Sequence, residues 1–212
     1  MNKIYVFSGL GVDQRVFKNI DFYGLDINHI EWIKPEPNEP LTHYAKRIAE
    51  NRIEPQSILM GLSFGGMLSV EISKLIPVEK IILIASAKTK NELPHGFLMK
   101  CLLKLRKLIP ERKLTRPNAI ADWFFGVKTK PEKQLLSDIL KDTDPGFFKW
   151  AINEIINWQN VTMPVNSIHI HGNKDRILPI KNVKADYVID GGGHFMTVSK
   201  AKEIGQIIRT LV

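Results

Sequence analysis

Residues 57–72 read SILMGLSFGGMLSVEI, a short apolar run followed by a glycine-rich turn and an apolar helical pattern. The run ends at Met60, and Ser63 stands at the centre of the turn between Gly61 and Gly65. In the pattern G-x-S-x-G a strained turn lifts a serine hydroxyl above the edge of a sheet, and the glycines let strand and helix approach closely. The stretch therefore predicts a strand, a tight turn with Ser63 at its apex, and a helix.

The pentapeptide is weak evidence by itself, because at about 7% glycine usage roughly one chain in fifteen of this length carries it by chance. The flanking residues strengthen the interpretation. Residues 58–60 are apolar up to the turn, and residues 67–75 have the apolar content of a helix packed on a sheet. Without these flanks the stretch would be interpreted as a glycine-rich loop.

Further apolar, β-favouring runs occur along the chain and alternate with helical patterns. Strands that are apolar throughout are typical of parallel sheets covered by helices on both faces, so the sequence predicts an α/β fold with about six parallel strands. The predicted strands are Ile4–Phe7, Asp26–Ile33, Ile58–Met60, Lys80–Ala85, Ser167–Ile170 and Asp186–Ile189, with helices over Leu41–Ile53 and Val198–Leu211.

The pattern changes between Lys88 and Asn160, where helical periodicities occur without a convincing strand. The net charge of +8 also lies here, since Lys88 to Lys133 holds twelve basic and four acidic residues and the rest of the chain is neutral. We expect any acidic partner to meet this segment rather than the sheet. The predicted helices are Phe97–Ile109, Glu132–Asp142 and Pro145–Trp158.

The composition, with 44% hydrophobic and 25% charged residues over 212 positions, is that of a soluble globular protein with one core. The single cysteine, Cys101, cannot form an internal disulfide, and the apolar run within residues 1–7 is too short for a signal peptide. No run approaches membrane-spanning length. We expect a cytoplasmic protein without stable membrane insertion. A pI near 9.5 alone does not predict nucleic-acid binding, because no binding motif accompanies it.

A serine hydroxyl is a poor nucleophile, so Ser63 needs a base to accept its proton and an acid to orient that base. Asp175 follows the predicted strand 167–170, and His194 follows the strand 186–189 through a glycine-rich turn. His194 is also the only one of six histidines after Asp175, and the order Ser-Asp-His is that of the α/β-hydrolase triad. An alternative role for Asp175 is to cap a short helix near Pro179. The rival acid Glu92 lies several residues too far from its strand.

Acyl transfer also needs backbone N–H groups that stabilise the developing oxyanion. The residue after the nucleophile, Phe64, is one expected donor. The second is expected in the loop after the first strand, Ser8-Gly9-Leu10-Gly11, with the Leu10 N–H as the preferred group.

Four motifs together make the chain similar to a small member of the α/β-hydrolase superfamily over nearly its whole length. They are residues 8–17 (SGLGVDQRVF), 61–66 (GLSFGG), 171–179 (HGNKDRILP) and 193–195 (GHF). The resemblance implies hydrolysis of esters or thioesters, and no cofactor. Two departures are Ser8, where many relatives have histidine, and the absence of the N-terminal strands of larger members.

The resemblance also implies a domain organisation: an α/β-hydrolase core over residues 1–87 and 161–212, and an inserted helical cap over residues 88–160. His169 and His171 alternate on a strand in the manner of metal ligands, but no third ligand accompanies them in the sequence. We therefore interpret both as structural histidines and predict no metal site.

The substrate and partner are less determined by the sequence. Phe97–Ile109 is a basic amphipathic helix that either covers the site or docks an anionic partner such as an acyl carrier protein. The aromatic residues of the cap suit a small core and also an apolar acyl pocket. Acyl transfer on the same triad, ligand binding without turnover and a lyase-type reaction remain as alternatives to hydrolysis.

Overall fold

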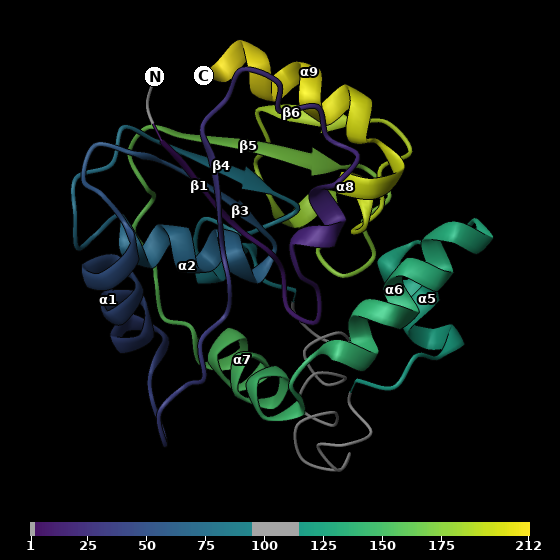
Figure 1. Cartoon of the computed structure of the whole chain (residues 1–212), viewed down its shortest axis with the longest axis horizontal. Coiled ribbons are helices and arrows are strands. Elements are labelled where there is room, and N and C mark those ends of the chain that lie inside the picture. Colours follow the sequence, from purple (N-terminus) through teal and green to yellow (C-terminus); the bar gives the residue numbers. More distant parts are fainter. Residues whose placement is uncertain (1–2, 95–114) are drawn as a thin grey trace.

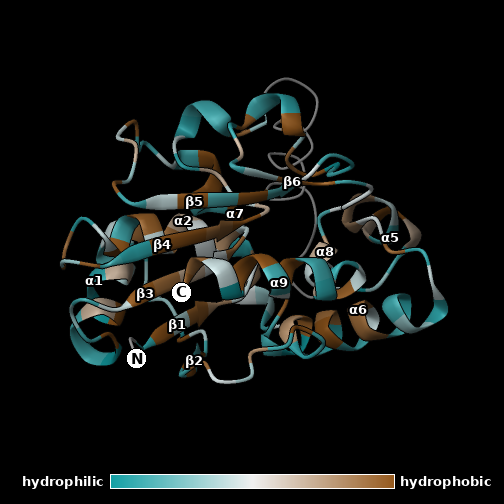
Figure 2. Cartoon of the chain, turned by 90° about the horizontal axis from the view of Figure 1, so that it is seen from above, coloured by the Kyte–Doolittle hydropathy of each residue, from teal (hydrophilic) through white to brown (hydrophobic). Residues whose placement is uncertain are grey.

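The computed structural model describes residues 3–94 and 115–212. Figure 1 shows a sheet with helices around it. The sheet has six parallel strands in the order β2-β1-β3-β4-β5-β6, which can be followed in Figure 2. The number of strands and their parallel pairing confirm the predicted architecture. The strands are β1 (Ile4–Phe7), β2 (Ile27–Ile30), β3 (Ile58–Leu62), β4 (Lys80–Ile84), β5 (Ser167–Gly172) and β6 (Tyr187–Ile189).

Helices and short 3-10 turns connect the strands, and α5, α6 and α7 all lie between β4 and β5 in the chain. Within the described part of that connection, residues 85–94 and 115–166, there is no strand. The helices are α1 (Leu41–Arg52), α2 (Phe64–Ile72), α5 (Ala119–Phe125), α6 (Lys130–Asp142), α7 (Pro145–Asn157), α8 (Met196–Ser199) and α9 (Ala201–Leu211), and the 3-10 turns are η1 (Gln14–Phe17), η2 (Lys90–Glu92) and η3 (Ile180–Asn182).

Alternate residues of β1, β3 and β4 enter two different hydrophobic cores, because successive side chains point to opposite faces of a sheet. Ile4 and Val6 of β1 pack with η1, α8 and α9, whereas Tyr5 and Phe7 pack with α1 and α2. The helix α6 contributes to the first core and α7 to the second. Figure 2 shows the resulting concentration of hydrophobic residues along the strands. The sheet is therefore covered on both faces, as predicted.

The parallel register places the carboxyl ends of the strands along one edge of the sheet. Phe7 lies opposite Gly61, Leu62 opposite Ile84, and Gly172 opposite Ile189. The loops that follow β1, β3, β5 and β6 consequently leave the sheet on the same side. These four loops carry every residue that the sequence predicts for the active site.

Most predicted bounds agree with the structure to within two residues, and three elements differ by more. The second strand ends at Ile30 instead of Ile33, because the Tyr44 hydroxyl bonds both the N–H (2.9 Å) and the carbonyl oxygen (3.0 Å) of Ile33 and holds this residue off the sheet. The terminal helix is broken at Lys200 into α8 and α9. The helix α5 was not predicted.

Two predictions are not tested by these elements. The helix predicted over residues 97–109 lies outside the described residues, and the division into core and cap stays a prediction. Among the helices that the structure does describe, none is long and apolar enough to cross a membrane.

Candidate active site

Ser63 occupies a strained turn directly after β3 and before α2. Its backbone angles, φ 52° and ψ −118°, lie in a region that residues with a side chain seldom adopt. Two bonds from the β4 side hold the turn: the Ser63 N–H donates to the Ile84 carbonyl (2.8 Å), and the Ser86 hydroxyl donates to the Ser63 carbonyl (2.6 Å). The turn is thus fixed from the neighbouring strand.

The glycines of the turn are required by close backbone contacts. A Cβ atom at Gly61 would lie 2.4 Å from the backbone of Gly65, and one at Gly65 would lie 2.3 Å from the Ser8 carbonyl oxygen. Such distances are far below van der Waals contact, so strand, helix and the loop after β1 can meet here only without side chains. This explains both glycines of the G-x-S-x-G pattern.

The side chains of Ser63, His194 and Asp175 form one hydrogen-bonded chain. His194 Nε2 lies 2.9 Å from Ser63 Oγ, and His194 Nδ1 lies 2.7 Å from Asp175 Oδ2. Asp175 and His194 are both buried, which strengthens their mutual interaction. The structure thus brings together three residues that come from the loops after β3, β5 and β6.

Asp175 does not cap the short helix near Pro179, because the N-terminal residue of η3 is capped by no side chain and the partners of Asp175 lie before that helix. Its Oδ1 accepts hydrogen bonds of 2.8 Å from the N–H groups of Ile177 and Leu178. Its Oδ2 is the atom that contacts His194. The two oxygens of the carboxylate therefore have different partners: Oδ1 holds two amides of the bend before η3, and Oδ2 contacts His194.

The loop after β1 lies against Ser63. A Cβ at Gly9 would be 3.3 Å from the Ser63 Cβ. Among the described residues, no group accepts a hydrogen bond from the N–H of Leu10 or of Phe64. Both amides are therefore free to donate to a further acceptor.

His169 and His171 are fully buried on β5 and bond to each other. His171 Nδ1 lies 3.1 Å from His169 Nε2, and His171 Nε2 lies 2.8 Å from the Leu178 carbonyl oxygen. Burial lowers the pKa of His171, and burial together with the nearby His171 and Lys88 lowers the pKa of His169 to about 2. Both rings are therefore neutral at physiological pH.

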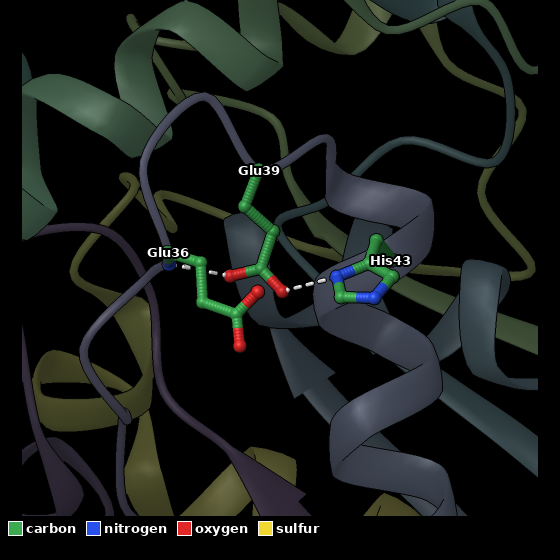
Figure 3. Close-up of side chains that lie close together, drawn as sticks. All are labelled: Glu36, Glu39 and His43. Atoms are coloured by element: carbon green, nitrogen blue, oxygen red, sulfur yellow. Dashed lines mark hydrogen bonds and ion pairs between the residues drawn. The ribbon is translucent and has the colours of Figure 1, made fainter.

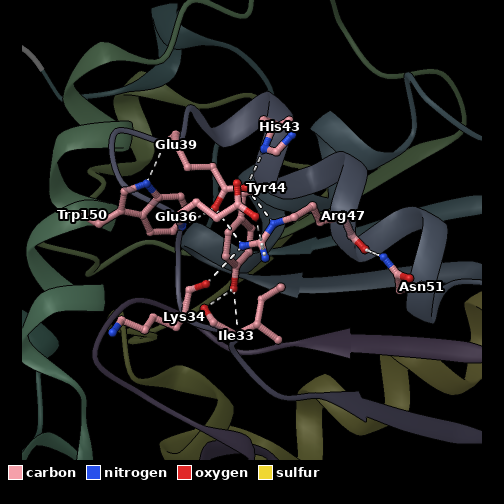
Figure 4. Close-up of polar contacts among 9 residues, drawn as sticks. All are labelled: Ile33, Lys34, Glu36, Glu39, His43, Tyr44, Arg47, Asn51 and Trp150. Carbon is pink, nitrogen blue, oxygen red and sulfur yellow. Dashed lines mark hydrogen bonds and ion pairs between the residues drawn. The ribbon is translucent and has the colours of Figure 1, made fainter.

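One group of three metal-ligating side chains occurs among the described residues: Glu36, Glu39 and His43 (Figure 3). The Glu39 carboxylate is already fully engaged. It accepts two 2.8 Å bonds from the Arg47 guanidinium, one of 2.8 Å from the Glu36 N–H and one of 2.7 Å from His43 Nδ1 (Figure 4). The arrangement is a structural clamp on the loop between β2 and α1.

The clamp also attaches α7 to the rest of the molecule. Trp150 Nε1 donates to the Glu39 carbonyl (2.7 Å; Figure 4), and Glu154 accepts from the Leu41 N–H at the start of α1 (2.8 Å). A third bond, from Trp158 Nε1 to Glu71 Oε1 (2.7 Å), ties the end of α7 to α2. These contacts place α7 beside α1 and α2, the second of which follows Ser63 directly.

The aromatic residues of the predicted cap are divided among several places. Phe147 packs at 4.9 Å from Trp32 and 6.4 Å from Phe64, measured between ring centroids. Phe125 of α5 instead packs edge-on against His194 at 5.8 Å, and its carbonyl accepts from the Phe195 N–H (3.0 Å). Phe125 and Phe147 are among the cap aromatics that the sequence suggested for a core or an acyl pocket, whereas Trp32 was not identified, because its contact with Phe147 joins distant segments.

Two cavities of about 340 and 370 Å³ lie between the loop after β1 and the segment after β2. Asp13 and Trp32 line both cavities, and Phe147 lines the larger one. Ser63, Asp175 and His194 line neither of these two cavities. The hollow space therefore lies on the β2 side of the loop that carries Leu10.

Comparison with known proteins finds no matching family model and no matching curated protein. Solved structures match over the whole chain. An esterase from Thermogutta terrifontis is 14% identical with a TM-score of 0.74, covering 99% of this chain and 89% of that one. An esterase from Exiguobacterium antarcticum is 15% identical with a TM-score of 0.73, covering 99% and 91%.

A lipase-esterase related protein from Clostridium acetobutylicum is 17% identical with a TM-score of 0.72, covering 100% of this chain and 94% of its own. At such identities the likeness shows the fold. The chain has the α/β-hydrolase fold, and this confirms the fold predicted from its motifs.

Proposed function

We propose that this chain is a serine hydrolase that cleaves carboxylic esters or thioesters through an acyl-enzyme intermediate. One observation carries the proposal: the unbroken hydrogen-bonded chain from Ser63 Oγ through His194 to Asp175 on a strained turn. This arrangement is the one that activates a serine hydroxyl for attack on an acyl carbon. The esterases of the same fold support the choice of an ester substrate.

In the first half-reaction Ser63 Oγ attacks the acyl carbon, and its proton passes to His194 Nε2 across the 2.9 Å contact. The bond to the leaving group then breaks, and His194 returns the proton to the departing oxygen or sulfur. Asp175 holds the Nδ1–H of His194 and balances the positive charge of the imidazolium.

In the second half-reaction a water molecule takes the place of the leaving group. His194 accepts a proton from the water, whose oxygen attacks the acyl carbon. The bond to Ser63 Oγ breaks, the serine regains the proton, and the carboxylic acid is released. In both halves the N–H groups of Leu10 and Phe64 donate to the oxyanion, a contribution of about 3–4 kcal/mol per donor in comparable sites.

We propose that residues 88–160, the predicted cap, select the substrate. Phe125 touches His194, and Phe147 packs on the side chain that follows Ser63, so helices of this segment adjoin the site from two directions. The identity of the acyl and leaving groups is tested by a panel of p-nitrophenyl esters of increasing chain length, acyl-CoA thioesters and acyl carrier protein thioesters.

The proposal is tested by labelling with a fluorophosphonate, followed by peptide mass spectrometry. We expect the label on Ser63, its loss in Ser63→Ala and its near loss in His194→Ala. Ser199→Ala, which removes an exposed hydroxyl on α8, is the matched control and keeps the label. A folded wild-type protein that neither reacts nor turns over any ester or thioester of the panel contradicts the proposal.

Turnover of the esters and thioesters in the panel also separates hydrolysis from acyl transfer. An alcohol or thiol acceptor is added during turnover, and the ratio of acid to transferred product is measured. Hydrolysis predicts that the acid remains the main product at millimolar acceptor. A product that follows the acceptor concentration would assign the enzyme to the transferases.

A further inference from the structure

His171 lies on β5 directly behind the acid of the site, with 0% of its surface exposed. Both ring nitrogens have partners. His171 Nε2 lies 2.8 Å from the Leu178 carbonyl oxygen, and His171 Nδ1 lies 3.1 Å from His169 Nε2. A buried polar ring with two short contacts is held in one orientation, since leaving either nitrogen unpaired would cost free energy.

The partners determine where the protons lie. A carbonyl oxygen only accepts, so Nε2 of His171 carries a proton and donates it to Leu178. In a neutral ring Nδ1 is then bare and accepts from the Nε2–H of His169. This assignment leaves His169 Nδ1 as a bare acceptor, and that atom is indeed buried without a partner.

Leu178 connects this pair to Asp175. While its carbonyl accepts from His171, its N–H donates to Asp175 Oδ1 (2.8 Å). Leu178 precedes Pro179, and a residue before proline is restricted to extended backbone conformations. Because this preference narrows the backbone angles of Leu178, holding its carbonyl also restricts the direction of its N–H group.

The other carboxylate oxygen of Asp175, Oδ2, is the one that contacts His194. Asp175 Oδ2 is 3.7 Å from His171 Nε2, which is too long for a hydrogen bond, and 2.7 Å from His194 Nδ1. His171 thus approaches the acid without competing with His194 for it.

We propose that His171 is a positioning residue: its Nε2–H, oriented by His169, holds the Leu178 peptide so that Asp175 presents Oδ2 to His194. The inference rests on the function proposed for Ser63, Asp175 and His194. His171 does not touch the reacting atoms, so it acts only through the placement of the acid.

Two conservative variants distinguish the contributions of the two ring nitrogens of His171. A glutamine amide reaches the position of Nε2 and can donate to Leu178, whereas an asparagine amide reaches only the position of Nδ1. We expect His171→Gln to keep kcat/KM within about threefold, and His171→Asn to lower kcat by about 10- to 100-fold with KM nearly unchanged. His43→Gln, on the exposed side of α1, is the control and leaves both constants unchanged.

A spectroscopic readout tests the inference independently of turnover. The low-field proton resonance of His194 Nδ1–H, assigned by its loss in His194→Gln, reports the contact with Asp175. We expect this resonance in the wild type and His171→Gln, and a shifted or broadened resonance in folded His171→Asn. His171→Phe is a second variant without a donor and should behave as the asparagine variant does.

The outcomes distinguish the two proposals. If the wild type is labelled at Ser63 and the glutamine and asparagine variants behave alike in kcat and in the resonance, the role of His171 is overturned and the hydrolase proposal stands. If the wild type is not labelled, the hydrolase proposal fails, and the resonance still decides whether His171 orients Asp175.

Discussion

The Ser86 hydroxyl donates a 2.6 Å hydrogen bond to the carbonyl oxygen of Ser63, so a residue after β4 supports the strained turn after β3. The same carbonyl also accepts from the N–H groups of Gly66 and Met67. The hydroxyl is therefore one of three donors to this oxygen.

Removing this donor should loosen the turn without unfolding the protein. We expect Ser86→Ala to lower the free energy of unfolding by about 1 kcal/mol, the usual net value of one hydrogen bond, because the carbonyl keeps its other donors. Urea denaturation monitored by tryptophan fluorescence measures the change. An unchanged free energy of unfolding would show that the Ser86 contact does not support the turn.

Replacement of Gly65 by alanine should be far more damaging. The new Cβ would lie 2.3 Å from the Ser8 carbonyl oxygen, so helix and loop backbones must separate, at an expected cost above about 3 kcal/mol. Gly205→Ala is the matched control, because its Cβ meets nothing closer than 3.4 Å and alanine favours the helix α9 by up to about 1 kcal/mol. The melting temperature should fall in Gly65→Ala and stay the same or rise in Gly205→Ala. Equal changes in the two variants would contradict the close contact between Gly65 and Ser8.

The two oxygens of Asp175 predict different effects for two substitutions. Asp175→Asn keeps an oxygen for the Ile177 and Leu178 amides but loses the charge that orients His194, so kcat should fall on the order of 10⁴-fold with little loss of stability. Asp175→Ala also leaves one buried and one partly buried N–H group without a partner, and stability should fall by about 2 kcal/mol. Kinetics and urea denaturation of both variants measure these effects, and equal stability of the two would show that the Oδ1 contacts do not stabilise the bend.

The Glu39 clamp predicts a pH-dependent contribution to stability. Burial raises the pKa of Glu39, but the Arg47 guanidinium, the Glu36 N–H and His43 outweigh it and leave the pKa below its ordinary value of 4.5. Because the folded pKa is depressed, the stabilisation is fully present above the unfolded pKa and is lost as the pH falls through the folded one.

The comparison with Glu39→Gln measures this contribution. The difference in free energy of unfolding between wild type and variant should be largest near pH 7 and shrink below about pH 4. Glu50→Gln, on the exposed side of α1, is the control and should show little pH dependence. A difference that is constant between pH 3 and pH 7 would contradict the role of the ion pair.

The sequence was sufficient to predict the sheet and the positions of the site residues. Continuous apolar runs such as Ile81–Ile84 are buried on both faces, so local composition is enough to identify them as strands. Asp175 and His194 follow directly after strands, and parallel strands bring such positions to one edge. The catalytic roles of these residues stay a proposal, although their side chains do meet.

What the sequence did not predict depends on contacts between distant segments. The early end of β2 results from Tyr44, eleven positions further along the chain, and no local pattern announces that hydroxyl as a partner for Ile33. The helix α5 has only seven residues and none of them is buried, so it lacks the apolar periodicity that identifies helices. His171 was interpreted as structural, but its link to Asp175 through Leu178 requires the coordinates.

The order of the strands along the chain has a consequence for biosynthesis. His194 follows all six strands in sequence, and it lies 131 residues after Ser63. A ribosome-bound chain that has not yet reached β6 lacks the proposed base and presents β5 as an unpaired edge, open to association with other chains. The exposed edge is therefore covered only when β6 is added, and the proposed triad is complete only five residues later, when His194 is added.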